Sequence, residues 1–171
     1  EALGVRREVI YLDPSPLTPH PSGVTPDPSR LPPGLRELLT AAVLCNGATL
    51  REESGTWQVI GDPTEGALLV AAAKVALTKE GLEDTAPFED EIPFDAERKM
   101  MTIIRRTVDG NMAYVKGAPD VLLPRCTHRL TLDGLIEPMS DQQQQIMLDT
   151  NVSLAQQTLR VLAVAHRRLD G

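Results

Sequence analysis

The chain has 171 residues, of which 24 are acidic and 17 are basic, so its formal net charge is −7; 42% of its residues are hydrophobic. This length and composition predict one globular domain. They exclude a membrane-spanning helix, which needs about 18 consecutive apolar residues. They also exclude nucleic-acid binding through the phosphate backbone, because that requires a basic face. A few converging cations could still hold a small anion.

The two cysteines, Cys45 and Cys126, are too few for a disulfide scaffold and too far apart for a CxxC motif. They are typical of reduced thiols in a cytosolic protein. The chain starts at Glu1 without methionine or a signal peptide and ends at Gly171. This indicates one domain, residues 1–171, excised from a longer protein.

The N-terminal part predicts a strand and then a long connection. Residues 5–11 include the β-branched residues Val5, Val9 and Ile10 and the aromatic Tyr11, which favours a strand. Residues 13–34 contain eight of the fourteen prolines, and proline cannot donate a backbone hydrogen bond to a helix or a central strand. We expect a surface loop there. The alternative is a PxxP ligand for a protein partner.

The next elements are a helix, a hairpin and a second helix. Apolar residues recur at helical spacing over residues 35–45. Residues 49–60 alternate like two paired strands. Asp62 then supplies an N-cap, followed by a proline and by an acid at the third helical position. We expect this second helix to run to Leu77.

The C-terminal part predicts hairpins mixed with helices, without the repeated βαβ alternation of a parallel sheet. The fold class expected is therefore α+β, with a largely antiparallel sheet flanked by helices. The predicted strands are residues 88–94, 100–107, 112–116, 128–132 and 160–166, and the predicted helices are residues 119–123 and, after a capping box at Ser140, residues 141–159.

Four segments place polar residues at the edges of apolar elements: residues 61–68, 93–100, 115–119 and 159–163. Singly each is a weak signal, but together they are specific. In this order and spacing they resemble the nucleotide-binding (N) domain of P-type ATPases, in particular the calcium-type branch in its bacterial form. The most diagnostic parts are Asp-Pro-Thr-Glu-Gly-Ala-Leu from Asp62 and Lys-Gly-Ala from Lys116.

The resemblance implies that two residues contact the adenine base of a bound nucleotide. Phe94 would lie against adenine, because an aromatic face stacks on a base. Glu65 would accept a hydrogen bond from the adenine amine, which favours adenine over guanine because guanine carries a carbonyl there. The alternatives are a core position for Phe94 and a helix-capping role for Glu65.

The resemblance also implies that Lys116, Gly117 and Ala118 line the deep end of the pocket. Lys116 ends a strand, and Gly117 has no side chain, so that the backbone can approach a ligand closely. The alternative for Lys116 is an exposed lysine whose ammonium reaches solvent.

Cations would reach the phosphates from two further segments. Lys99 matches the family position better than its neighbour Arg98, and Arg160 suits phosphate because its guanidinium is planar. Leu162 would pack beside the adenosine. Some family members carry an arginine where this chain has Ala96, so one cation is missing here. We expect an affinity for ATP on the order of 0.1–1 mM.

As a member of this family, the chain would bind ATP and present the γ-phosphate to an aspartate on a separate phosphorylation domain. The Asp-Lys-Thr-Gly-Thr motif of that domain is absent here, so the chain has no catalytic residue of its own. Mg²⁺ would be held mainly by that domain. Further partners would be the actuator domain and the membrane helices of an ion pump, with this domain on the cytoplasmic side of the plasma or inner membrane. Calcium is the ion that the likeness implies.

Two alternatives stay open: an interaction module that uses the proline-rich loop, and an N domain whose pocket no longer binds nucleotide. A metal site is not expected, because the three histidines are scattered without a second ligand at metal spacing. The acidic residues 89–91 fit a solvated strand end better than a general acid/base pair. The sequence contains neither a P-loop nor a GxGxxG motif.

Overall fold

The computed structural model describes residues 8–10, 28–54 and 56–169. Within them, seven strands form one sheet in the order β4-β5-β6-β9-β1-β7-β8, and two more form the separate hairpin β2-β3. Strands β1 and β7 pair in parallel, and the other neighbours are antiparallel. The strands are β1 Glu8–Ile10, β2 Thr49–Glu53, β3 Thr56–Ile60, β4 Phe88–Asp95, β5 Met100–Thr107, β6 Gly110–Gly117, β7 His128–Leu130, β8 Ile136–Pro138 and β9 Ala163–Arg168.

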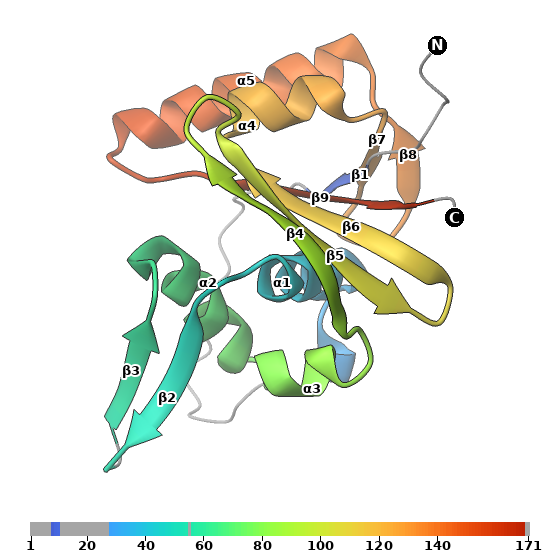
Figure 1. Ribbon diagram of the computed structural model, residues 1–171. Coiled ribbons are helices and arrows are strands. Elements are labelled where there is room, and N and C mark those ends of the chain that lie inside the picture. Colours follow the sequence, from blue (N-terminus) through green and yellow to red (C-terminus); the bar gives the residue numbers. More distant parts are fainter. Residues whose placement is uncertain (1–7, 11–27, 55, 170–171) are drawn as a thin grey trace.

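Helices cover both faces of the sheet (Figure 1). α4 and α5 lie across one face, whereas α1 crosses the other face, with α2, α3 and the β2-β3 hairpin on the same side. This arrangement confirms the predicted α+β fold with a largely antiparallel sheet. The helices are α1 Pro33–Leu44, α2 Pro63–Ala73, α3 Lys79–Glu83, α4 Pro119–Leu122 and α5 Asp141–Gln156, with 3-10 turns η1 Pro28–Arg30 and η2 Leu123–Arg125.

The core follows from the alternation of side chains along the central strands. On β5, Met101 packs in the cluster that α1 forms with the sheet, whereas Met100 packs with α4 and α5 on the opposite face. A third cluster joins α1 to α2 through Val43 and Leu69. Among the described residues, no helix is long and apolar enough to cross a bilayer.

The N-terminal predictions are only partly covered by the described residues. Of the predicted strand 5–11, the structure describes β1. Residues 13–27 of the proline-rich stretch lie outside the described residues. The end of that stretch differs from the predicted loop, because η1 is a 3-10 turn and α1 begins at Pro33. Proline is compatible with the first turn of a helix, where its missing amide has no partner to lose.

Two helices end about one turn earlier than the sequence predicts. α2 ends at Ala73, before Leu77, and α5 ends at Gln156. In each case a residue other than glycine turns into the left-handed region, with φ of 59° at Ala76 and 62° at Thr158. The next amide then donates back to a carbonyl of the last helical turn, which satisfies that carbonyl.

The last strand is displaced along the chain. β9 begins at Ala163, whereas the apolar pattern predicts a strand over residues 160–166. Residues 160–162 instead form the link that enters β9, which leaves their side chains available to a cavity. Two short elements, α3 and β8, are not predicted from the sequence. The remaining helices, the β2-β3 hairpin and strands β4 to β7 are found where they were predicted, within a few residues.

Candidate functional site

A cavity of about 500 Å³ opens beside the first turn of α2, where the ends of β4 and β6 meet the link before β9. Small-molecule sites commonly have volumes of about 300–1,000 Å³. All eight residues named from the sequence line it: Glu65, Phe94, Lys99, Lys116, Gly117, Ala118, Arg160 and Leu162. The wall also contains six residues that were not named as site residues: Asp62, Thr64, Glu91, Pro93, Met101 and Val161.

Asp62 starts α2 at the edge of this cavity. Its Oδ1 accepts hydrogen bonds from the amides of Thr64 (2.8 Å) and Glu65 (3.1 Å), so it is the N-cap that the sequence predicts. The hydrogen bond from Glu65 is the main cause of a lowered pKa at Asp62, and the positive charge of Arg160 contributes less. The exposed carboxyl group therefore stays ionised at neutral pH.

Glu65 does not act as a capping acid, so that alternative is wrong. Its Oε1 accepts from the Lys116 ammonium at 2.7 Å, and its Oε2 accepts from the Gly47 amide at 3.1 Å. The helix N-terminus is already capped by Asp62, so the carboxylate is free to leave the helix. It therefore reaches the strand end at the inner side of the cavity.

Lys116 is buried, and the alternative of an exposed lysine is wrong. The residue is only 5% exposed. Besides Glu65, its ammonium donates to the Cys45 carbonyl at 2.8 Å. A buried ammonium is costly unless a counter-charge and acceptors accompany it, and here both are present. Lys116 therefore presents a fixed positive charge to the deep end of the cavity.

The neighbouring β4-β5 turn explains why position 117 is occupied by a glycine. A Cβ atom at this position would lie 2.6 Å from the Lys99 carbonyl oxygen and 2.6 Å from the Met100 Cβ. That carbonyl also accepts from the Ala118 amide at 3.0 Å, and Lys99 has a φ of 50°. From the sequence, Gly117 was expected to let the backbone approach a ligand closely. In the structure, the missing side chain lets β6 approach the β4-β5 turn, while Gly117 still lines the cavity.

The two cations of the β4-β5 turn, Arg98 and Lys99, line different cavities. Lys99 lines the cavity, and its ammonium lies 3.5 Å from the Asp120 carboxylate in an exposed ion pair. Arg98 lines a different cavity of about 320 Å³ instead. Of the two neighbours, the geometry therefore favours Lys99 as the cation that faces a ligand.

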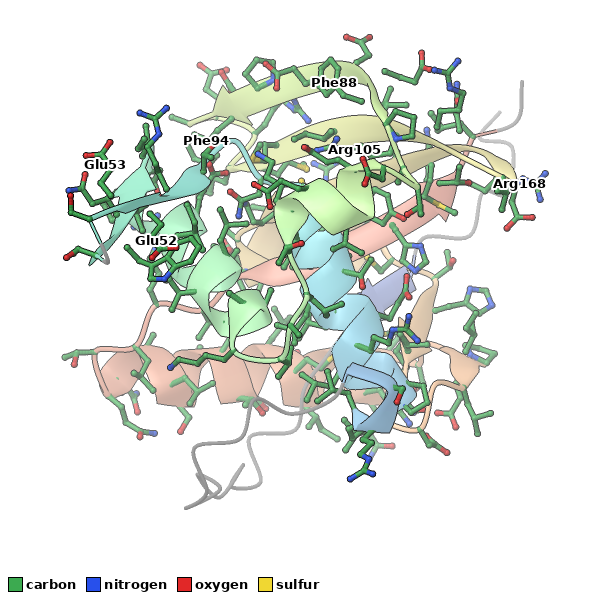
Figure 2. The ribbon with its side chains drawn as sticks, turned by 90° about the horizontal axis from the view of Figure 1, so that it is seen from below. Glu52, Glu53, Phe88, Phe94, Arg105 and Arg168 are labelled. Carbon is green, nitrogen blue, oxygen red and sulfur yellow. The ribbon has the colours of Figure 1, made fainter. Side chains whose placement is uncertain are left out.

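Phe94 presents an exposed aromatic ring. It is 62% exposed, so it is not the core phenylalanine of the alternative interpretation. Figure 2 shows it on β4, toward the end of the strand that lies on the side of the β2-β3 hairpin. Phe88, on the same strand, instead meets the Arg105 guanidinium, which lies 5.8 Å from its ring centroid. Phe94 therefore has an open face where a flat ring can stack.

The charges of the cavity balance. Three cations, Lys99, Lys116 and Arg160, face three carboxylates, those of Asp62, Glu65 and Glu91. Lys116 is paired with Glu65, so Lys99 and Arg160, nearer the mouth, are the two outer cations that remain for an anionic group. The cavity thus combines an aromatic surface, a fixed hydrogen-bond acceptor and two outer cations. This combination suits a flat heterocycle with an anionic tail.

The described residues offer no obvious reactive centre at this cavity. They contain no group of three or more histidine, cysteine or acidic residues that could hold a metal ion. Burial raises the pKa of the nearby Cys45 thiol to about 12, so this cysteine stays protonated and is a poor nucleophile.

Comparison with known proteins gives a consistent result. A family model described as "P-type ATPase, cytoplasmic domain N" matches residues 34–171. The cation-transporting ATPase pma1 of Synechocystis is 40% identical over 141 residues, which are 82% of this chain and 15% of that protein. The calcium-transporting ATPase of Bacillus subtilis is 40% identical over 134 residues, 78% of this chain and 15% of that protein.

A more distant relative is the probable cation-transporting ATPase F of Mycobacterium tuberculosis, 36% identical over 129 residues. These cover 75% of this chain and 14% of that protein. The chain thus spans about 15% of the length of the curated relatives that it matches.

Proposed function

The chain belongs to the family of P-type ATPase cytoplasmic N domains, and on this premise we propose that its 500 Å³ cavity binds ATP. The observation that carries the proposal is that eight residues, taken from four separate sequence segments, line this one cavity. These eight residues were identified from sequence motifs alone, and a common ligand explains why all of them meet at one cavity. The chemistry of the two ends of the cavity supports ATP in particular.

At the inner end, Glu65 and Phe94 recognise the base. Phe94 stacks on adenine with its exposed face. A carboxylate has about four lone-pair positions, and Lys116 and Gly47 each take one from Glu65. The others remain for the adenine amine, whereas guanine would bring a carbonyl oxygen against this negative charge. The site therefore prefers adenine to guanine.

At the outer end, Lys99 and Arg160 contact the phosphates, with Leu162 packed against the adenosine. Their charge is partly offset by the carboxylates of Asp62 and Glu91 in the same wall. Because two outer cations meet two outer anions and Ala96 supplies no further charge, binding is weak. We expect a dissociation constant on the order of 0.1–1 mM.

In the longer protein, residues 1–171 would form one nucleotide-binding domain of an ATP-driven cation pump in the plasma or inner membrane. The domain delivers the γ-phosphate to an aspartate on a separate phosphorylation domain, which also holds most of the Mg²⁺ coordination. Phosphoryl transfer depends mainly on positioning and charge stabilisation, so a mobile binding domain and a separate acceptor can share it. The names of the relatives, a calcium-transporting ATPase among them, support cation transport and favour calcium.

The proposal is tested by titrating the ¹⁵N-labelled chain with ATP and, separately, with GTP. We expect the amide signals of Glu65, Phe94 and Gly117 to shift and to saturate in the sub-millimolar to millimolar range with ATP, and to respond more weakly to GTP. If neither nucleotide moves these signals, ATP binding is refuted and an interaction module becomes the better explanation.

A further inference from the structure

The last residue of α1 and the backbone that follows it are held by three cationic side chains from three other elements. Arg105 of β5 donates to the Leu44 carbonyl at 3.0 Å, and Lys116 of β6 donates to the Cys45 carbonyl at 2.8 Å. Lys79, the first residue of α3, donates to the carbonyls of Asn46 (2.8 Å) and Ala48 (2.9 Å). The last carbonyls of a helix lack partners within the helix and carry partial negative charge. Here tertiary contacts satisfy them.

The Asn46 side chain forms hydrogen bonds that hold the same turn. Asn46 is only 1% exposed. Its side-chain amide donates to the Glu65 carbonyl at 3.0 Å, and its side-chain oxygen accepts from the Ala48 amide at 2.9 Å. One buried side chain therefore joins the end of α1 to the first turn of α2.

Gly47 lies between the two carbonyls that Lys79 holds. Its amide donates to Glu65 Oε2 at 3.1 Å. Because the Asn46 carbonyl and the Gly47 amide belong to the same planar peptide unit, the hydrogen bond from Lys79 to this carbonyl also sets the direction of the amide. Lys79 does not line the cavity, yet it determines one of the two contacts that orient the Glu65 carboxylate.

We propose that Lys79 and Asn46 are positioning residues for base selection: together they aim the Gly47 amide at Glu65 and so keep the free lone pairs of this carboxylate directed into the cavity. The inference rests on the proposed function. Discrimination against guanine depends on where the carboxylate oxygens point, and one contact, from Lys116 alone, allows the group to rotate. The network therefore strengthens the binding of ATP and leaves that of GTP nearly unchanged.

The test compares K79M with the matched control K74M, because Lys74 is an exposed lysine at the end of α2. Affinities for ATP and GTP are measured by NMR titration, and unfolding by urea is measured in parallel. We expect K79M to bind ATP about threefold to tenfold more weakly with little change for GTP, so that the ATP-to-GTP preference falls. K74M keeps the wild-type preference, and K79R restores part of it because a guanidinium can reach both carbonyls.

A second measurement reports on the network without nucleotide. In K79M the Gly47 amide proton should exchange faster and shift upfield, whereas in K74M it should not change. The proposal is overturned if K79M lowers both nucleotide affinities equally, as a loss of stability alone would do, or if the Gly47 amide is unaffected. If the wild-type chain binds no ATP, the proposed function itself fails and base selection fails with it. A change at the Gly47 amide would then show only that Lys79 orders this turn.

Discussion

The Lys116 ammonium lies 2.7 Å from Glu65 Oε1, which joins the end of β6 to the first turn of α2. The Lys116 side chain is 6% exposed and that of Glu65 is 16% exposed. This buried ion pair closes the inner end of the cavity and combines two tasks. It compensates the buried charge of Lys116, and it orients the Glu65 carboxylate, which we propose accepts a hydrogen bond from the adenine amine.

A double-mutant cycle on this pair tests the coupling. We expect K116M to lower the free energy of unfolding by about 2–4 kcal/mol, because the Glu65 carboxylate loses its counter-charge. E65Q should also be destabilising, since it leaves a buried ammonium without an opposite charge. The double variant should lose less than the sum of the two. Urea denaturation measures all four proteins, and purely additive losses would contradict the coupling.

Replacing the exposed ring should affect binding but not folding. We expect F94L to bind ATP about tenfold more weakly, because a leucine cannot stack on the base. Its unfolding should match the wild type, since the residue is 62% exposed. F88L is the matched control on the same strand and should bind ATP normally. Calorimetric titration checks both variants, and equal losses would show that Phe94 has no special role.

The close approach of β6 to the β4-β5 turn makes Gly117 sensitive to any side chain. We expect G117A to destabilise the fold by about 1–3 kcal/mol, because the new Cβ would lie 2.6 Å from the Lys99 carbonyl. G81A in α3 serves as the comparison and should cost less, because its Cβ would lie 3.2 Å from the Thr78 hydroxyl, which is a side-chain atom, and because alanine favours the helix. Thermal unfolding measures both. A wild-type melting temperature for G117A would show that the turn can move aside.

The two motifs of the site, which begin at Asp62 and at Lys116, differ in how well local sequence predicts their structure. Asp62 and Pro63 mark a helix start because an N-cap and a first-turn proline are local signals. The Lys-Gly-Ala triplet was found through its likeness to a family, since nothing local distinguishes a buried lysine from an exposed one. Its burial depends on Glu65, fifty-one positions away in sequence.

Other features could not be predicted because their causes are tertiary. Ala76 and Thr158 end their helices in a left-handed conformation that is usual for glycine, so the sequence carries no stop signal there. Glu91 was interpreted as a solvated strand end, and only the tertiary fold brings this residue of β4 to the same cavity wall as the start of α2. The role of Lys79 likewise depends on where α3 packs.

The N-cap of α2 should make stability depend on pH. The pKa of Asp62 is lowered in the folded protein, chiefly by the Glu65 amide, so the ionised cap stabilises the fold above the ordinary carboxyl value of 3.8. That contribution is lost as the pH falls through the lower folded value. We expect D62N to have a lower melting temperature than the wild type at pH 6, and the difference to disappear as the pH falls below the lowered pKa of Asp62. A constant difference would contradict this assignment.

Asp120 should compete with phosphate for Lys99. Their ion pair at 3.5 Å is exposed, so it is screened by solvent and easily exchanged. We expect D120N to bind ATP about twofold more tightly at low salt, because Lys99 is then available to the phosphates. The gain should vanish at high salt. Titrations at two ionic strengths check this, with D149N in α5 as a control. Weaker binding by D120N would contradict it.

The central claim is that adenine lies against Phe94 in this cavity, and intermolecular nuclear Overhauser effects test it most directly. The chain contains two phenylalanines, and Phe88 serves as the internal control because it lies outside the cavity wall. With the phenylalanine rings ¹³C-labelled and ATP at several millimolar, we predict cross-peaks between the adenine H2 and H8 protons and the Phe94 ring, and none to Phe88. Saturating ATP without cross-peaks to Phe94 would contradict the account.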